Sequence, residues 1–225
     1  DDAERDGDKI YAVLRGMGSS SDGKGNAIYA PSAEGQTKAL WNAYREADVT
    51  PRSIELVEAH GTGTSVGDAV EAKALSGVYR QDNDAETWCA VGSVKSMIGH
   101  TKAAAGIAGL IKTAMALKHK VLPPSIKVDE PLELINPGTA PIYLNSIKRP
   151  WLKTQATPRR AALSAFGFGG SNFHCVLEEA EETKTDIEWD GQVLIIALGG
   201  ETKAELIKQL PDDSLLQSWN ELRFF

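Results

Sequence analysis

The chain has 225 residues, of which 42% are hydrophobic and 24% are charged, as in an ordinary globular protein. No apolar run reaches the roughly 18 residues of a membrane-spanning helix, and a net charge of −7 provides no basic surface for nucleic acid. The two cysteines, Cys89 and Cys175, lack CxxC partners and are too few for a disulfide framework, so we expect a reducing, cytoplasmic environment.

The first half of the chain alternates short apolar strands with helices. Ser32 is the expected N-cap of the first helix, and the glycine- and serine-rich residues 18–26 are expected to form a loop. The hydrophobic patterns predict strands over residues 10–17, 54–59 and 89–94, and helices over residues 33–47 and 67–79.

The longest predicted helix covers residues 100–119. It is apolar nearly all round, so we expect it to be buried on most sides. Ala103, Gly106 and Gly109 would let neighbouring backbones approach it closely, and a Pro-Pro pair after residue 122 would end it. Later strands are predicted over residues 141–145, 160–166 and 172–178. This succession of buried strands and helices predicts an α/β fold.

An acidic segment separates this α/β part from the end of the chain. Residues 178–190 contain seven acidic residues and one lysine, which is typical of a solvated connector. Beyond it, the stretches QVLIIALGG and TKAELIKQL predict a strand and a helix that begin a new unit. We therefore expect three parts: residues 1–180, an acidic connector over 181–190, and a second unit that begins at 191 and continues to 225.

The first candidate for chemistry is the motif HGTGT at residues 60–64. His60 follows a buried strand, and loops at strand ends are where α/β proteins place functional groups. The two glycines allow a sharp turn and a close ligand, and Thr62 and Thr64 offer hydroxyl groups. On this motif alone, a structural histidine with ordinary capping chemistry is an equally good interpretation.

A lysine and a second histidine lie in the stretch GSVKSMIGHTKAAAG. His100 falls near the start of the long helix, where the helix dipole disfavours a positive charge, so a neutral imidazole could donate to a carbonyl oxygen. Glu71 lies on the apolar face of its predicted helix, because the residues three, four and seven positions later are apolar. A buried carboxylate needs a partner, and Lys95 is the expected one. A capping histidine and a solvated lysine are the alternatives.

The stretch AFGFGGSNFHCVLEE alternates two phenylalanines with glycines. Phe166 and Phe168 therefore suit a loop that moves, or one that lines an apolar slot, and a β-turn with two core phenylalanines is the alternative. His174 lies within a strand pattern, and we interpret it as structural.

Other chemistries are disfavoured. Residues 18–25 come close to a P-loop, but Gly25 replaces the Ser or Thr that would bind magnesium. The nucleophile elbow G-x-S-x-G is absent. No metal site is expected, since His60 and His100 have no further ligand at metal spacing.

Three motifs carry a resemblance to a known family: EAHGTGTSVGDAVEAKAL, GSVKSMIGHTKAAAG and SAFGFGGSNFHCVLEEA. In this order and spacing they resemble the second half of a β-ketoacyl synthase domain, over roughly residues 3–180. The resemblance is closest to polyunsaturated fatty acid synthases and related iterative polyketide synthases. It implies a thiolase-like fold with α-β-α-β-α layers, usually paired into a dimer. Residues 191–211 are similar to the start of the linker domain that leads to an acyltransferase.

The implied reaction is a decarboxylative Claisen condensation of a malonyl unit on acyl carrier protein with an acyl chain held on a cysteine. The resemblance assigns His60 and His100 to hydrogen bonding of the malonyl thioester oxygen, which stabilises the enolate that develops there. It assigns Lys95 and Glu71 to organising the site.

The resemblance also implies how substrates are held. Thr62 and Thr64 match positions that contact the phosphopantetheine arm, and Phe166 and Phe168 match the gating loop beside the nucleophile. No directly bound cofactor is implied, because the substrates are carried on the arm of acyl carrier protein.

The chain departs from the family in one respect. The family's nucleophilic cysteine lies in a D-x-A-C-S-type motif well before the first histidine, and no cysteine precedes His60 here. Neither Cys89 nor Cys175 has the nucleophile's context of a helix start with small neighbours. We therefore expect the isolated chain to be inactive, and its partners to be an N-terminal half bearing the cysteine, acyl carrier protein, a second copy and an acyltransferase domain.

Two other functions share these features. A non-condensing structural partner of the chain-length-factor type would carry an inert residue at the nucleophile position, but it would need none of His60, Lys95 and His100. A degradative thiolase acting on coenzyme A would use a second cysteine in place of one histidine, and His100 speaks against it. The sequence upstream of the first motif would discriminate between the enzyme and the structural partner.

Overall fold

The computed structural model describes residues 2–23, 30–81, 87–135, 140–153, 157–180 and 202–208. The chain divides into two units, residues 1–181 and 182–225. In the second unit, helix α6 (Lys203–Lys208) is described. The predicted acidic connector and the strand predicted within QVLIIALGG lie outside the described residues, and the assignment of a linker domain stays a prediction.

The first unit is an α/β structure, as predicted. Its helices are α1 (Asp2–Asp6), α2 (Ala33–Ala47), α3 (Ser65–Arg80), α4 (Lys95–Ile98) and α5 (Ala105–His119). Its strands are β1 (Val13–Ser21), β2 (Leu56–Glu58), β3 (Cys89–Gly92), β4 (Val121–Leu122), β5 (Ile142–Leu144), β6 (Arg149–Pro150), β7 (Arg160–Gly167) and β8 (Ser171–Glu178). Short 3₁₀ turns lie at Pro51–Ser53, Lys102–Ala104 and Glu133–Ile135. No helix among the described residues is long and apolar enough to cross a membrane.

Six of the described strands form one sheet in the order β1-β8-β7-β2-β3-β5. The strands β7, β2, β3 and β5 run parallel to their neighbours in this order, whereas β8 pairs antiparallel with both β7 and β1. The parallel strands deliver the loops after β2, β3 and β7 to the same edge of the sheet.

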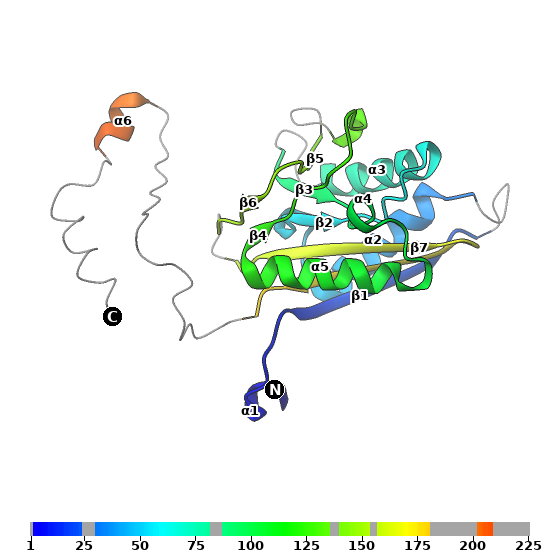
Figure 1. Cartoon of the computed structure of the whole chain (residues 1–225), viewed down its shortest axis with the longest axis horizontal. Coiled ribbons are helices and arrows are strands. Elements are labelled where there is room, and N and C mark those ends of the chain that lie inside the picture. Colours follow the sequence, from blue (N-terminus) through cyan, green and yellow to red (C-terminus); the bar gives the residue numbers. More distant parts are fainter. Residues whose placement is uncertain are drawn as a thin grey trace. The chain divides into compact units, whose positions relative to one another are not determined.

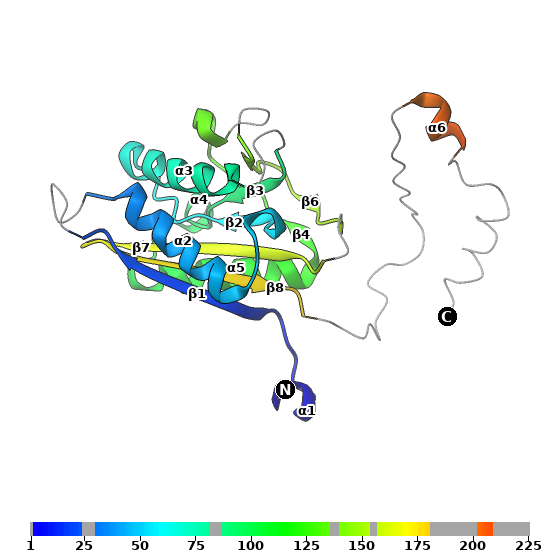
Figure 2. The ribbon, with the colours of Figure 1, turned by 180° about the vertical axis from the view of Figure 1, so that it is seen from behind.

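Helices cover both faces of this sheet, with α5 on one face and α2 and α3 on the other (Figures 1 and 2). Successive side chains along a strand point to opposite faces of the sheet, so they contribute to two separate hydrophobic cores. Leu56, Ala90 and Ala161 pack with Leu117 of α5. The residues that follow them, Val57, Val91 and Ala162, pack with Leu40 of α2 and Leu75 of α3.

The long apolar segment differs from its prediction. The helix begins at Ala105 rather than at residue 100, and it is buried on one face only. Ile107, Ile111 and Met115 lie on its exposed side, because within the described residues the sheet covers a single face of this helix. The expectation of burial on most sides is therefore wrong for this chain by itself.

The predicted loop at residues 18–26 is wrong in its first part. Strand β1 continues through Ser21, because Gly18–Ser21 pair with Ser171–His174 of β8. Two glycines of β1 face helix α2 at very short range: a Cβ added at Gly16 would lie 2.5 Å from the Ala47 nitrogen, and one at Gly18 would overlap backbone atoms of Ala39 and Ala43. The glycines therefore serve strand–helix packing rather than a loop.

His174 joins a buried polar network in the larger core. Its Nδ1 lies 2.9 Å from the Ser164 hydroxyl and its Nε2 lies 3.1 Å from the Tyr44 hydroxyl, which lies 2.9 Å from that of Tyr79. The side chain is 1% exposed, and burial lowers its pKa to about 3. These contacts are those of a neutral structural histidine.

Two glycine substitutions test the close packing of β1 on α2. We expect Gly18→Ala to lower the free energy of unfolding by about 1–3 kcal/mol, because the added methyl group overlaps helix backbone that cannot move aside. The control is Gly77→Ala in α3, where nothing lies within 4 Å of the new Cβ. This variant should gain up to about 1 kcal/mol from helix propensity. Equal changes in the free energy of unfolding for the two variants, measured by urea titration, would contradict this packing.

A second prediction concerns acid stability. The unfolded chain protonates His174 near its ordinary value of 6.5, whereas the folded chain resists protonation down to about pH 3. The free energy of unfolding that the neutral His174 contributes is therefore lost progressively as the pH falls from 6.5 towards 3. We expect the free energy of unfolding to fall by about 2 kcal/mol between pH 7 and pH 5 because of this residue. His174→Gln, measured by urea unfolding at both pH values, should remove that part of the pH dependence.

Candidate active site

The loop after β2 is shaped by a carboxylate from helix α3. Glu71 accepts hydrogen bonds from the backbone amides of His60 at 2.7 Å and of Gly61 at 2.9 Å. Gly61 has φ +43°, and a Cβ on it would lie 2.7 Å from the Cβ of Ser93, so only glycine fits there. Asp68 accepts from the amide of Gly63 at 3.1 Å. The loop is thus held by two acids of the helix that follows it.

Glu71 is 4% exposed, which confirms its predicted burial. Burial raises its pKa to about 7, and the bonds from the two amides oppose that rise. The predicted ion pair with Lys95 is wrong: no ion pair joins these two described residues. The amides of His60 and Gly61 already occupy both oxygens of the carboxylate, so Lys95 acts on Glu71 only as a more distant charge.

The two predicted histidines lie together. The ring centroids of His60 and His100 are 5.8 Å apart, with the planes at 85°. His100 follows α4 in a non-helical segment and does not lie on α5, so the expected role of that helix's dipole does not apply. The proximity of the rings comes instead from the loops after β2 and β3.

Each imidazole accepts a backbone hydrogen bond at Nδ1. The Phe166 amide donates to His60 at 3.3 Å, and the Lys102 amide donates to His100 at 3.0 Å. A neutral ring that accepts at Nδ1 carries its proton at Nε2. Both histidines therefore present an Nε2–H donor, and this assignment of tautomers follows from the hydrogen-bond pattern.

Partial or full loss of solvation and nearby positive charge lower the pKa of both rings. Burial lowers the pKa of His60 to about 4, and the charge of Lys95 and the neighbouring His100 lower it further. The side chain of His100 is exposed, and its pKa is also lowered, by partial desolvation and then by the charges of Lys95 and Lys102. The site therefore holds two uncharged donors at neutral pH.

Lys95 opens the short helix α4 directly after β3 and is half-buried. Burial lowers its pKa, while the negative charges of Glu58, Glu71 and Asp68 oppose that shift. Its positive charge in turn lowers the pKa values of His60 and His100.

Of the remaining predicted residues, some lie on or beside the His60 loop and one is exposed to solvent. Thr62 and Thr64 share a hydroxyl contact of 3.1 Å on the loop of His60. The ring of Phe166 lies 5.6 Å from that of His60. Phe168, by contrast, is 91% exposed at the tip of the turn between β7 and β8, where Gly169 and Gly170 have φ +91° and +80°. The structure brings Phe166 to His60, whereas Phe168 is exposed to solvent.

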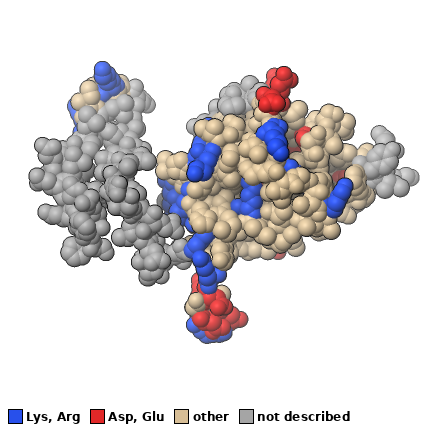
Figure 3. All heavy atoms as spheres, in the orientation of Figure 1, with Lys and Arg blue, Asp and Glu red and all other residues tan. Residues whose placement is uncertain are grey.

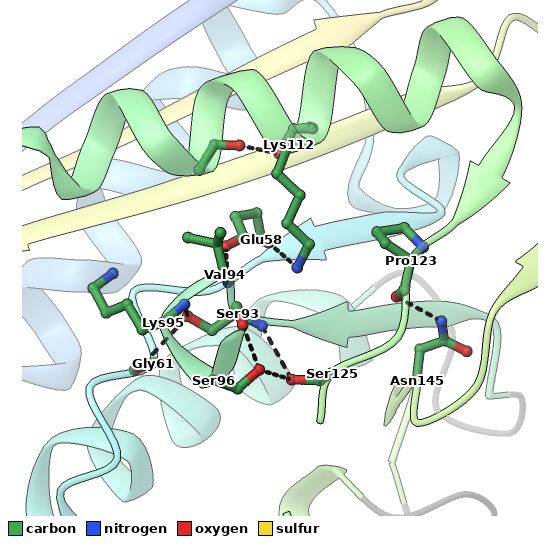
Figure 4. Close-up of polar contacts among 12 residues, drawn as sticks. Glu58, Gly61, Ser93, Val94, Lys95, Ser96, Lys112, Pro123, Ser125 and Asn145 are labelled. Atoms are coloured by element: carbon green, nitrogen blue, oxygen red, sulfur yellow. Dashed lines mark hydrogen bonds and ion pairs between the residues drawn. The ribbon is translucent and has the colours of Figure 1, made fainter. Parts of the chain in front are cut away.

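Sequence reasoning missed Glu58 and Lys112. Glu58 is 2% exposed at the end of β2. It accepts from the Val94 amide at 2.5 Å and from the Lys112 ammonium of α5 at 2.7 Å (Figure 4). Burial raises the pKa of Glu58, and Lys112 is the main opposing influence. The available signal was a lysine in the middle of a mostly apolar helix, whose other lysine, Lys118, lies in the last turn. Among the described residues, no cluster of His, Cys, Asp or Glu could hold a metal ion.

Residues 11–129 match the family model described as beta-ketoacyl synthase, C-terminal domain. The chain is 53% identical over 188 residues to a polyunsaturated fatty acid synthase polypeptide of Thraustochytrium sp., and this match covers 80% of the chain. It is 44% identical over 183 residues to polyketide synthase PksL of Bacillus subtilis, over 81% of the chain. The chain spans 7% and 4% of the lengths of these two proteins.

A solved structure has a similar fold. The ketosynthase from module 6 of the bacillaene synthase of Bacillus subtilis is 44% identical and superimposes with a TM-score of 0.76. The match covers 80% of this chain and 32% of that ketosynthase.

A titration tests the electrostatics of the histidine pair. We expect NMR to show His60 neutral down to about pH 4. Lys95→Met should raise this pKa by removing a nearby positive charge, but not to the ordinary value of 6.5, because burial is the larger cause. Lys38→Met, at an exposed position of α2, is the control and should leave the titration unchanged. A midpoint near 6.5 in the unmodified chain would contradict the buried, neutral His60.

Proposed function

The chain belongs to the β-ketoacyl synthase family and has its thiolase-like α/β fold, and from this we propose that it forms the decarboxylating part of a ketosynthase. The relatives are polyketide and polyunsaturated fatty acid synthases. The proposed reaction is the condensation of a malonyl unit on acyl carrier protein with an acyl thioester. The observation that carries the proposal is the pair of neutral imidazoles, each with Nδ1 occupied and Nε2–H available.

Two Nε2–H donors suit one oxygen atom on which negative charge develops. When malonyl thioester loses carbon dioxide, the electron pair of the broken C–C bond moves to the α-carbon and the thioester oxygen. His60 and His100 would donate to that oxygen and stabilise the enolate. The enolate carbon then attacks the acyl thioester, and the cysteine sulfur leaves as thiolate. No proton has to be supplied during decarboxylation, which is consistent with donors that remain neutral.

Neutral donors also have an advantage over cationic ones here. A protonated imidazole would form an ion pair with the malonyl carboxylate and stabilise the substrate more than the transition state, in which that charge disperses. The lowered pKa values of His60 and His100 avoid this. Lys95 contributes by lowering the pKa values of both rings, which keeps them uncharged.

The substrate arm is proposed to run beside the loop of His60. Thr62 and Thr64 would contact the phosphopantetheine arm through their hydroxyl groups, and Phe166 would form an apolar wall beside His60. The exposed Phe168, flanked by two glycines, suits a turn that moves as a gate when an acyl chain is present.

The proposal requires partners for this chain. The chain spans about a third of the crystallised ketosynthase, and we propose that an N-terminal half supplies the nucleophilic cysteine. The exposed apolar side chains of α5, Ile107, Ile111 and Met115, support a covering segment there. The face of the first unit that is seen in Figure 3 is mostly tan, with separate Lys or Arg side chains on it. The other proposed partners are acyl carrier protein, a second copy and an acyltransferase domain, in the cytoplasm.

The function is tested by alanine substitutions in the synthase that contains this chain. We expect His60→Ala and His100→Ala each to slow the release of carbon dioxide from malonyl-acyl carrier protein by about 100- to 1,000-fold, as for the loss of one oxyanion donor. His119→Ala, at the exposed end of α5, is the control and should have no effect.

Three outcomes of this experiment decide between the possible functions. Unchanged decarboxylation in both histidine variants would exclude the proposed role. Decarboxylation without β-ketoacyl product in the unmodified synthase would indicate the non-condensing, chain-length-factor type of partner. Condensation by the 225-residue chain alone would contradict the need for a nucleophile from elsewhere.

A further inference from the structure

A buried ion pair lies directly beneath the proposed active site. Glu58 ends β2 two residues before His60, and its Oε1 accepts from the amide of Val94, the residue before Lys95. Its Oε2 accepts from the Lys112 ammonium, which reaches down from α5 (Figure 4). One carboxylate thus joins the strand that carries the first histidine, the turn that carries the lysine, and the helix packed over both.

We propose that Glu58 is a positioning residue that fixes the Lys95 turn against the His60 loop, and that Lys112 holds Glu58 in place for this purpose. The inference rests on the proposed function, because the groups that it aligns are those proposed to stabilise the enolate. Glu58 itself is 2% exposed and bonds to Val94 and Lys112, so we assign it a positioning role and not contact with the substrate.

A second contact fixes the same turn from its other side. The Ser93 hydroxyl donates to the carbonyl oxygen of Gly61 at 3.3 Å, and the Lys95 amide donates to that hydroxyl at 3.4 Å. The turn is therefore tied to β2 through Glu58 and to the histidine loop through Ser93. Of these two ties the one through Glu58 is the shorter and is charge-assisted, so we expect it to dominate.

The space around Glu58 leaves its carboxylate little freedom. A Cβ on Gly109 of α5 would lie 3.1 Å from the Cγ of Glu58 and 2.7 Å from the Cδ1 of Leu163. The Lys112 ammonium approaches Gly92 at the end of β3, where an added Cβ would lie 3.8 Å from it. Glycines on both sides thus allow the helix and the strand to close around the pair.

Stability alone does not explain the pair. A well-packed apolar pair is often as stable as a buried ion pair, because the ions lose their hydration. A directed bond to the Val94 amide is something that an apolar side chain cannot make. The pair therefore has its clearest use in fixing geometry.

Glu58 also sets the charge around Lys95. The groups that act on Lys95 are Glu58 from β2, and Asp68 and Glu71 from α3, with Glu58 the strongest of the three. On the other side lie the neutral imidazoles of His60 and His100, and the charge of Lys112 is taken up by Glu58 itself. Removal of the Glu58 charge should therefore lower the pKa of Lys95.

The test combines kinetics on the synthase with NMR on the 225-residue chain. We expect Glu58→Gln and Lys112→Met to lower kcat for malonyl decarboxylation by at least about tenfold with KM unchanged, because misplacement affects the transition state rather than carrier binding. Glu58→Asp keeps the charge but shortens the reach to the Val94 amide, and it should also lower kcat. Lys112→Arg keeps the cation and should retain most of the activity.

A matched control and a second readout separate positioning from folding. Glu178→Gln removes a carboxylate paired with Arg160 at 2.7 Å on β8, and it should leave kcat unchanged. In chains with ¹³C-methylated lysines, Glu58→Gln should lower the pKa of Lys95, and Glu178→Gln should not. Far-UV circular dichroism of each variant checks that it is folded.

The outcomes distinguish this inference from the proposed function. Full kcat and an unchanged Lys95 pKa in folded Glu58→Gln would overturn the positioning role while the function stands. If the unmodified synthase does not decarboxylate malonyl-acyl carrier protein, the proposed function fails, and the Lys95 pKa still reports whether Glu58 acts on that residue. A loss of stability in Glu58→Gln, with kcat retained in the folded fraction, would assign the pair to structure alone and contradict the proposal.

Discussion

A carboxylate that is removed from water needs hydrogen-bond donors for its oxygens. The arrangement of this site depends on how two buried carboxylates, those of Glu71 and Glu58, meet that requirement. Glu71 accepts from two amides of the loop after β2. Glu58 accepts from the amide of Val94 and from the ammonium of Lys112. These amides belong to the segments that carry His60 and Lys95, so satisfying the buried acids places the residues that are proposed to act in the site.

The parallel part of the sheet makes these contacts possible. β2 pairs with β3 on one side and with β7 on the other, and the ends of all three face the same edge. The loop after β2 carries His60, the segment after β3 carries Lys95 and His100, and the end of β7 supplies the amide that bonds to His60. Groups far apart in the chain therefore converge through strand pairing.

Local signals predicted the elements best where packing agreed with them. Helix α2 runs over Ala33–Ala47, as predicted from its N-cap and its amphipathic pattern. The glycines and serines at 18–21 favour a loop locally, but pairing with β8 and close packing on α2 make them a strand. The apolar pattern of α5 predicted burial on most sides, yet such a pattern does not show whether a covering partner belongs to the same chain.

The sequence by itself determined the family, the α/β class and the presence of two histidines, a lysine and a buried glutamate, because these are carried by motifs whose spacing is local. Only the tertiary structure decided which partner each charged group meets. Glu71 binds backbone amides instead of Lys95, and Lys112 reaches Glu58 across 54 positions of the chain. Such pairings depend on distances between packed elements, and no pattern of neighbouring residues specifies those distances.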